Sequence, residues 1–81
     1  MSEADKYIGF RIKQVKPKTL VHEVFSKDND ETIGVVKWYP PWRHYCFFPC
    51  ADTVFSDRCM LRIGEFVKSA NEAHEEARRK R

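Results

Sequence analysis

The spacing of apolar residues changes once along this 81-residue chain, and that change constrains the fold more than any other feature. Between residues 7 and 48, stretches with apolar side chains at every second position are separated by polar turns, which is typical of half-buried β-strands. From residue 56 onward, apolar residues recur three and four positions apart, which is typical of an amphipathic helix. The chain is therefore predicted to fold as a group of strands followed by one helix.

Turn residues divide the first part of the chain into four predicted strands. These strands span residues 7–15, 19–26, 32–39 and 42–48. Pro17 ends the first strand, because proline cannot donate a hydrogen bond to a β-ladder. The polar residues 27–31 form the next turn, and Pro40 and Pro41 form the last. The two strands beside the proline pair are close enough to form an antiparallel hairpin.

The helix is predicted to begin after Ser56, a residue type favoured at helix N-caps, and to continue to about Arg78. Asp57 and the C-terminal cations suit the two ends of the helix dipole. The predicted fold is of the α+β class: a three- to four-stranded antiparallel sheet followed by one long C-terminal helix packed on one face. Residues 1–6 are predicted to be a flexible leader, residues 7–78 a single ββββα domain, and residues 79–81 a basic tail.

Composition indicates a small globular protein of the cytoplasm, the cytosol of a host cell. Hydrophobic residues make up 42% of the chain and charged residues 33%, a globular mixture. No apolar run approaches the roughly 20 residues of a membrane span, and residues 1–6 do not resemble a secretory signal. The three cysteines are an odd number, which argues against a disulfide framework. The formal net charge of +3 favours polyanions or acidic protein surfaces as partners.

An aromatic segment, residues 37–49, contains both tryptophans, two of the three tyrosines and three of the four prolines. Because aromatic side chains dominate cores and interfaces, this segment is predicted to hold the fold together, meet a partner, or do both. The helix covers one sheet face, and we assign Val36, Trp38, Cys46 and Phe48 to that face. A register shift of one residue would reverse the assignment. The uncovered face could also be closed by a second copy of the chain, which leaves a homodimer possible.

The uncovered face is predicted to carry rings interleaved with cations, an arrangement suited to single-stranded nucleic acid. The candidate nucleic-acid or partner-binding residues are Lys37, Tyr39, Trp42, Arg43, Tyr45, Arg11, Lys13, Arg78 and Arg79. The last two belong to the basic tail, which would add phosphate contacts or simply complement the helix dipole. The alternative interpretation of the rings is a structural core, which a domain of this size needs for stability.

Catalytic and metal-binding signatures are weak in this sequence. His44, Cys46, Cys50 and Cys59 are ligand types for zinc, but their spacing does not match a pair of zinc knuckles, and buried, inert cysteines are the favoured interpretation. No local motif supports a cysteine–histidine nucleophile. His22 and His74 are isolated, and His74 is predicted to be solvated among glutamates. We therefore predict a non-enzymatic protein with no cofactor and no metal.

Residues 33–66 contain the segment Lys37-Trp38-Tyr39-Pro40-Pro41-Trp42-Arg43-His44-Tyr45-Cys46-Phe47-Phe48-Pro49. This region, a little under half of the chain, resembles small uncharacterised proteins encoded by phages and prophages. The resemblance implies a mobile-element setting and a compact sheet-plus-helix unit. It transfers no activity and no functional residues, although small phage proteins are often nucleic-acid binders or inhibitors of host enzymes.

Two functions follow from these patterns. The first is nucleic-acid binding through the aromatic and basic sheet face, with single strands favoured. The second is a protein that blocks a host defence complex, with the same aromatic patch as the centre of a protein interface. The acidic turn at residues 28–31 could mimic phosphate in the second case, although a simple polar turn is its more common role.

Overall fold

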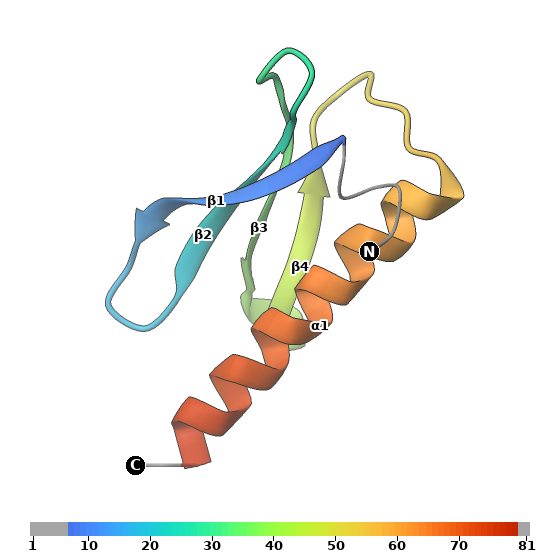
Figure 1. The fold of residues 1–81 in the computed structure, drawn as a ribbon. Coiled ribbons are helices and arrows are strands. Elements are labelled where there is room, and N and C mark those ends of the chain that lie inside the picture. The colour runs from blue at the N-terminus through green and yellow to red at the C-terminus, as the bar shows by residue number, and fades with distance from the viewer. Residues whose placement is uncertain (1–6, 80–81) are drawn as a thin grey trace.

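The computed structural model describes residues 7–79 as four strands and one long helix (Figure 1). The elements are β1 (Ile8–Val15), β2 (Leu20–Ser26), β3 (Thr32–Tyr39), the 3-10 turn η2 (Pro40–Trp42), β4 (His44–Pro49) and α1 (Asp57–Arg79). The predicted α+β arrangement of an antiparallel sheet followed by one long helix is confirmed. The predicted leader, residues 1–6, and the last two residues of the predicted tail lie outside the described residues.

Each strand pairs with the next one along the chain, so the antiparallel sheet has the order β1-β2-β3-β4. Successive antiparallel strands reverse direction at alternate ends of a sheet. The β1–β2 and β3–β4 connections therefore lie at one end, and the β2–β3 turn and the segment leading to α1 lie at the other (Figure 1). We call the end with the β1–β2 and β3–β4 connections the lower end, as it stands in Figure 1. This topology decides which charged turns become neighbours.

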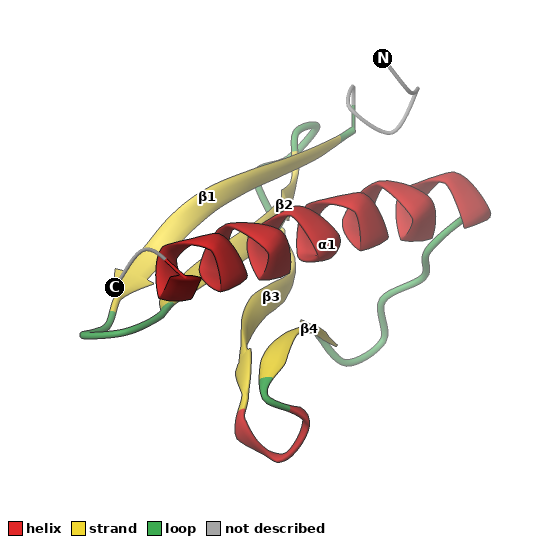
Figure 2. Cartoon of the chain, turned by 90° about the horizontal axis from the view of Figure 1, so that it is seen from below, coloured by secondary structure: helices red, strands yellow, loops and turns green. Residues whose placement is uncertain are grey.

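Ser56 starts α1 as the sequence predicts. Its side-chain oxygen accepts a hydrogen bond from the Cys59 N–H at 3.2 Å, and its carbonyl accepts one from the Met60 N–H at 3.0 Å. Two backbone donors of the first turn are thereby satisfied, which is the role of an N-cap. The helix then runs diagonally across one face of the sheet (Figure 2).

The core lies between the sheet and α1. Its buried side chains are Ile8, Val24, Val36, Tyr45 and Ile63. At its margin, Phe10 of β1 stacks on Phe66 of α1 with ring centroids 4.1 Å apart and planes within 6°. Trp38 of β3 lies 4.5 Å from the His74 ring of α1. The helix therefore contacts rings from both halves of the sheet, while no helix or strand of residues 7–79 covers the opposite face (Figure 2).

The facing of β4 differs from the prediction. Val36 and Trp38 face α1 as predicted, but Tyr45 pairs opposite Trp38 and also faces α1, where it is 5% exposed. Cys46 and Phe48 lie on the uncovered face instead of the helix face. The assignment of β4 is therefore wrong by one residue, and every side chain on that strand changes face as a result.

The parity of the turn length shows why the predicted facing of β4 is wrong. Four residues, 40–43, separate β3 from β4, and Tyr39 pairs with His44. A loop with an even number of residues pairs even-numbered positions with odd-numbered ones. The predicted turn, Pro40 and Pro41, is also even, so the assignment of Trp38 and Cys46 to one face did not agree with that turn. Arg43 adopts the left-handed conformation at φ 54°, and its N–H donates to the carbonyl of Tyr39 at 3.0 Å. Trp42 consequently belongs to the turn, and β4 begins two residues later than predicted.

Asn71 attaches α1 to the outer edge of β4. Its Oδ1 accepts a hydrogen bond from the Tyr45 N–H at 2.6 Å, and its Nδ2 donates to the Tyr45 carbonyl at 3.3 Å. An edge strand otherwise presents unpaired backbone groups to any strand that approaches it. Asparagine is a poor residue for a helix interior, so this tertiary contact accounts for its position.

We expect Asn71→Ala to lower the free energy of unfolding by about 1–2 kcal/mol, because two part-buried hydrogen bonds are lost. The gain in helix propensity, at most about 0.7 kcal/mol, offsets part of that loss. Urea unfolding followed by circular dichroism measures the effect. Ser69→Ala, an exposed change on the same helix, has the propensity gain without the lost bonds and should leave stability equal or slightly higher. Equal stability of Asn71→Ala and the wild type would contradict the edge contact.

Candidate nucleic-acid interface

Four rings gather where the uncovered face meets the β3–β4 turn. We call Tyr39, Trp42, His44 and Phe48 the ring cluster. Tyr39 is its centre, with ring centroids 5.0 Å from Trp42 and 5.9 Å from Phe48, both in edge-to-face geometry. His44 lies 6.0 Å from Trp42 at a tilted angle. Such aromatic pairs contribute about 0.5–1.5 kcal/mol each, so the cluster holds Trp42 in place although its side chain is 65% exposed.

Two cations border the ring cluster. The Lys37 ammonium lies 4.7 Å from the centroid of the Phe48 ring, within cation–π distance. Arg43 follows Trp42 in the turn and is exposed. Of the predicted site residues, the structure therefore brings together Lys37, Tyr39, Trp42 and Arg43. The register of β4 adds His44 and Phe48, which the prediction did not include.

Tyr45, by contrast, is a core residue and not part of the surface. Its ring lies 5.5 Å from Trp38 and 6.0 Å from His74, both in edge-to-face geometry. Its hydroxyl oxygen accepts a hydrogen bond from the Leu20 N–H at 3.0 Å. A side chain that is 5% exposed cannot stack on a base, so the predicted placement of Tyr45 on the open face is corrected.

Arg11 is on the uncovered face, but its charge is already paired. Its guanidinium donates to Glu23 at 2.7 Å and to Asp30 at 2.9 Å, and it lies 4.1 Å from the centroid of the Phe25 ring. The hydrogen bond to Glu23, followed by the one to Asp30, raises the pKa of Arg11 above its usual value. Two carboxylates around one guanidinium leave little attraction for phosphate, so Arg11 contributes less to the predicted platform than its charge suggests.

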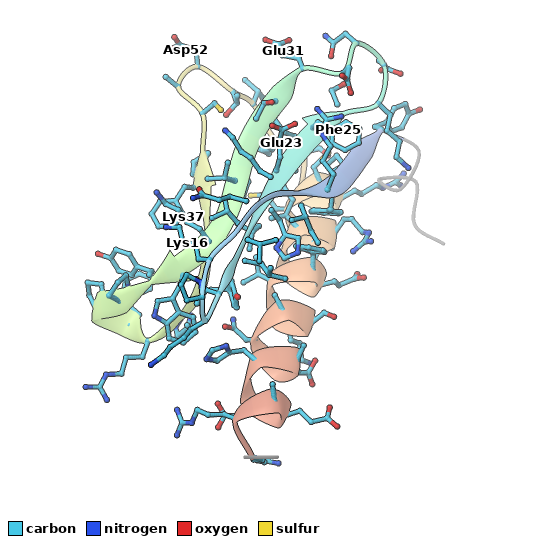
Figure 3. All side chains as sticks on the ribbon, turned by 90° about the vertical axis from the view of Figure 1, so that its left-hand side faces the viewer. Lys16, Glu23, Phe25, Glu31, Lys37 and Asp52 are labelled. Carbon is cyan, nitrogen blue, oxygen red and sulfur yellow. The ribbon has the colours of Figure 1, made fainter. Side chains whose placement is uncertain are left out.

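Charged residues are separated between the two ends of the sheet. The cations Lys13, Lys16 and Lys18 lie in or beside the β1–β2 connection, and Arg43 lies in the β3–β4 turn, at the same end. The acids Asp28, Asp30, Glu31 and Asp52 lie at the opposite end. Figure 3 shows Glu31 and Asp52 together at one end, with Lys16 away from them. The ring cluster therefore lies at the basic end of the molecule.

Arg78 and Arg79 are exposed in the last turn of α1, which extends past the sheet at the lower end (Figure 1). Glu72 and Glu75 precede them on the same helix. These glutamates offset much of the local positive charge. Among residues 7–79, the surplus positive charge of the basic end therefore comes from the two turns and not from the helix, and phosphate contact by Arg78 and Arg79 stays a prediction.

The cysteines are unpaired thiols. The Cys46 sulfur lies 3.7 Å from His44 Nδ1, and burial raises the pKa of this thiol, which favours the protonated form over the nucleophilic thiolate. Within residues 7–79, no group of three His, Cys, Asp or Glu side chains could hold a metal ion.

Sequence reasoning missed a relationship between His22 and His74. Both line a pocket between the β1–β2 connection and α1. His74 is half-buried against Trp38 and is therefore not the solvated residue that the sequence predicts. The two histidines belong to elements far apart in the sequence, so no local pattern could have connected them.

None of the helical segments within residues 7–79 has the length and hydropathy that a membrane span requires.

Comparison with known proteins identifies a phage relative. No family model matches this chain, and no solved structure matches it. The "Uncharacterized 9.3 kDa protein" of Acholeplasma phage L2 is 30% identical over 71 residues, which are 86% of this chain and 91% of the phage protein. The predicted likeness to small phage proteins is confirmed at this level, while the shared aromatic segment stays a prediction. The chain belongs to the same family as this small phage protein.

Proposed function

We propose that this protein binds single-stranded nucleic acid at its basic end, without catalysing a reaction. One observation carries the proposal: the exposed ring of Trp42 lies beside Arg43, at the end of the sheet where the turn lysines also gather. Rings supply stacking surfaces for unpaired bases, and lysine and arginine neutralise phosphates.

The ring cluster is suited to an unpaired strand rather than to a duplex. A protruding, 65%-exposed indole can stack on a base that has left its helix, at about 1–3 kcal/mol per base. Bases inside a duplex already stack on one another and present only their edges to a protein. The lysines of the β1–β2 connection extend the positive surface along the same end.

The experiment is a fluorescence titration with Trp42 as the reporter. Trp38 is packed against Tyr45 and His74, so we would use Trp38→Phe, which leaves Trp42 as the sole tryptophan. Single-stranded DNA or RNA should quench Trp42, and the affinity should fall steeply as salt rises, because each neutralised phosphate releases counterions. Trp42→Phe, with Trp38 as the reporter, is the matched control and should show little quenching. No quenching of Trp42 and no change in oligonucleotide anisotropy at low salt would overturn the proposal.

The second candidate function, blocking a host defence protein, is favoured by an apolar groove between β4 and α1. The groove has a volume of about 570 Å³, and Phe47, Met60 and Val67 are among its lining residues. The N–H and C=O groups of Tyr45 point away from β3, toward Asn71. Backbone hydrogen-bonding direction alternates from residue to residue along a strand, so the N–H and C=O groups of Phe47 also point away from β3. A groove beside an exposed strand edge can receive an extended peptide.

Met60→Lys and Leu61→Lys separate this function from the first. Met60 lines the groove, whereas Leu61 is not among its lining residues; both are well exposed, at 58% and 68%. If the protein blocks a host target through the groove, the wild type and Leu61→Lys should capture one host protein in stoichiometric amount. Met60→Lys should not capture it. Trp42 and His44 also line the groove, but neither substitution removes a ring or a cation of the proposed nucleic-acid site, so oligonucleotide binding should not be lost in either variant. Equal capture by the two variants would contradict a role of the groove.

A further inference from the structure

A second binding site lies near the ring cluster but is separate from it. The pocket shared by His22 and His74 has a volume of about 500 Å³, within the range of small-molecule sites. Lys16 and Lys18 of the β1–β2 connection form one side, and Phe66 of α1 contributes to an apolar wall. No member of the ring cluster is among its lining residues.

The electrostatic character of this pocket favours an anion. Two lysines supply positive charge, and the lining includes no aspartate or glutamate. The lysines are exposed, so their ammonium groups are free to turn toward a ligand at the mouth.

Hydrogen-bonding capacity inside the pocket is incompletely used. The Tyr45 hydroxyl oxygen accepts from the Leu20 N–H, which leaves its own O–H able to donate to a ligand. His22 packs edge-to-face on Phe66 with centroids 4.9 Å apart, and its buried Nδ1 has no partner among the described residues. Desolvation lowers the pKa of His22, which favours the neutral ring with one N–H donor. A buried polar atom without a partner is uncommon in folded proteins and requires an explanation, which a ligand in the pocket would supply.

We propose that this pocket binds a nucleoside monophosphate unit, with the phosphate at Lys16 and Lys18 and the base or sugar toward Phe66. The size of the pocket, its cationic mouth and its apolar inner wall match the two halves of such a ligand. The ligand is either a free mononucleotide or the phosphorylated 5′ end of a strand. The first source is independent of the proposed function, and the second rests on it.

Histidine NMR tests the proposal because the chain has three histidines in two places. His22 and His74 line the pocket, whereas His44 belongs to the ring cluster. Titration with adenosine or uridine 5′-monophosphate should shift the ring signals of His22 and His74 saturably, with a dissociation constant of about 1 mM or tighter. His44 should move little. The nucleoside without phosphate should bind at least about tenfold more weakly.

Ala73→Leu and Ala77→Leu provide the matched control. Both residues are exposed on α1, but only Ala73 is among the pocket-lining residues. Leucine at position 73 should fill the pocket and weaken mononucleotide binding by about tenfold or more, while leucine at position 77 should not. Absent histidine shifts, or shifts that are equal in the two variants, would overturn the proposal.

Two oligonucleotides identify the source of the ligand. A short strand with a 5′-phosphate should shift His22, His74 and His44 if the pocket receives a strand end, and the same strand with a 5′-hydroxyl should then shift His44 alone. If the free mononucleotide shifts the pocket histidines and neither strand does, the ligand is a small molecule. A third outcome is that the strands shift His44, while neither the free mononucleotide nor the 5′-phosphorylated strand shifts His22 and His74. This outcome would refute nucleotide binding in the pocket and leave the proposed function intact.

Discussion

Replacing Lys16, Lys18 and Arg43 together with glutamate is expected to weaken binding of single-stranded nucleic acid by about 100-fold or more at low salt. The three residues lie in the two connections of the basic end, so the substitutions remove the phosphate attraction and add repulsion at the same place. The remaining affinity should depend less on salt, because fewer counterions are released on binding. Fluorescence anisotropy of a labelled oligonucleotide at two salt concentrations measures both quantities.

A charge-matched control separates local from global electrostatics. The control variant combines Lys27→Glu, Arg58→Glu and Lys68→Glu. Like the first variant, it has a net charge of −3 instead of +3, because each substitution replaces a positive by a negative charge. Lys27 and Arg58 lie toward the acidic end and Lys68 on α1. The logarithm of the affinity should fall by less than about one tenth of its fall in the first variant. The salt dependence of the affinity should likewise change by less than about one tenth as much. Equal losses in the two triple variants would mean that net charge alone, and not the basic end, governs binding. Circular dichroism establishes that both variants are folded.

Gly34→Ala is expected to destabilise the fold by about 2–3 kcal/mol, near the upper end of the usual cost of overpacking. A Cβ atom at this buried position of β3 would lie 2.5 Å from Cζ of the Phe47 ring and 2.8 Å from the backbone oxygen of Phe48. Phe47 cannot turn aside without losing its edge-to-face contact with Phe55, at 5.5 Å. The oxygen of Phe48 belongs to the ladder with β3. The close approach of β4 to β3 therefore requires glycine here.

Gly64→Ala is the opposite case and the matched control. A Cβ atom at this exposed position in α1 would meet nothing within 4 Å. Alanine is the better helix former, so we expect an increase of about 0.5–1 kcal/mol in the free energy of unfolding. Thermal unfolding measures both variants, with a fall of about 10–20 °C for Gly34→Ala and a rise of a few degrees for Gly64→Ala. A Gly34→Ala variant as stable as the wild type would show that β3 and β4 separate more easily than the structure indicates.

The elements of the fold follow from local patterns. Alternating apolar residues predict the strands, and the three- and four-residue spacing after Ser56 predicts the helix, because these periods reflect backbone geometry within each segment. The N-cap role of Ser56 is likewise local and is confirmed by its hydrogen bonds. The candidate site follows from local patterns only in part. Lys37, Tyr39, Trp42 and Arg43 lie together because they are neighbours along the chain, whereas the members from β4 depend on the register of that strand.

The facing of β4 shows where local patterns fail. Both faces of this strand carry apolar or aromatic residues, so alternation by itself does not identify the inner face. The length of the turn decides the register, and the left-handed conformation of Arg43 closes that turn after four residues. Tyr45 therefore enters the core, and His44 and Phe48 join the ring cluster in its place.

From the sequence by itself came the number and order of the strands and the helix, the class of the fold, and the concentration of rings and cations around residues 37–43. The tertiary structure alone decided that Glu23 and Asp30 pair with Arg11, that Asn71 covers the edge of β4, and that His22 and His74 share a pocket with two lysines. The reason is physical: periodicity and capping depend on residues within a few positions of one another, whereas these contacts join residues separated by one or more elements. Their pairing depends on strand register and on how α1 crosses the sheet, and neither quantity is encoded in any single segment.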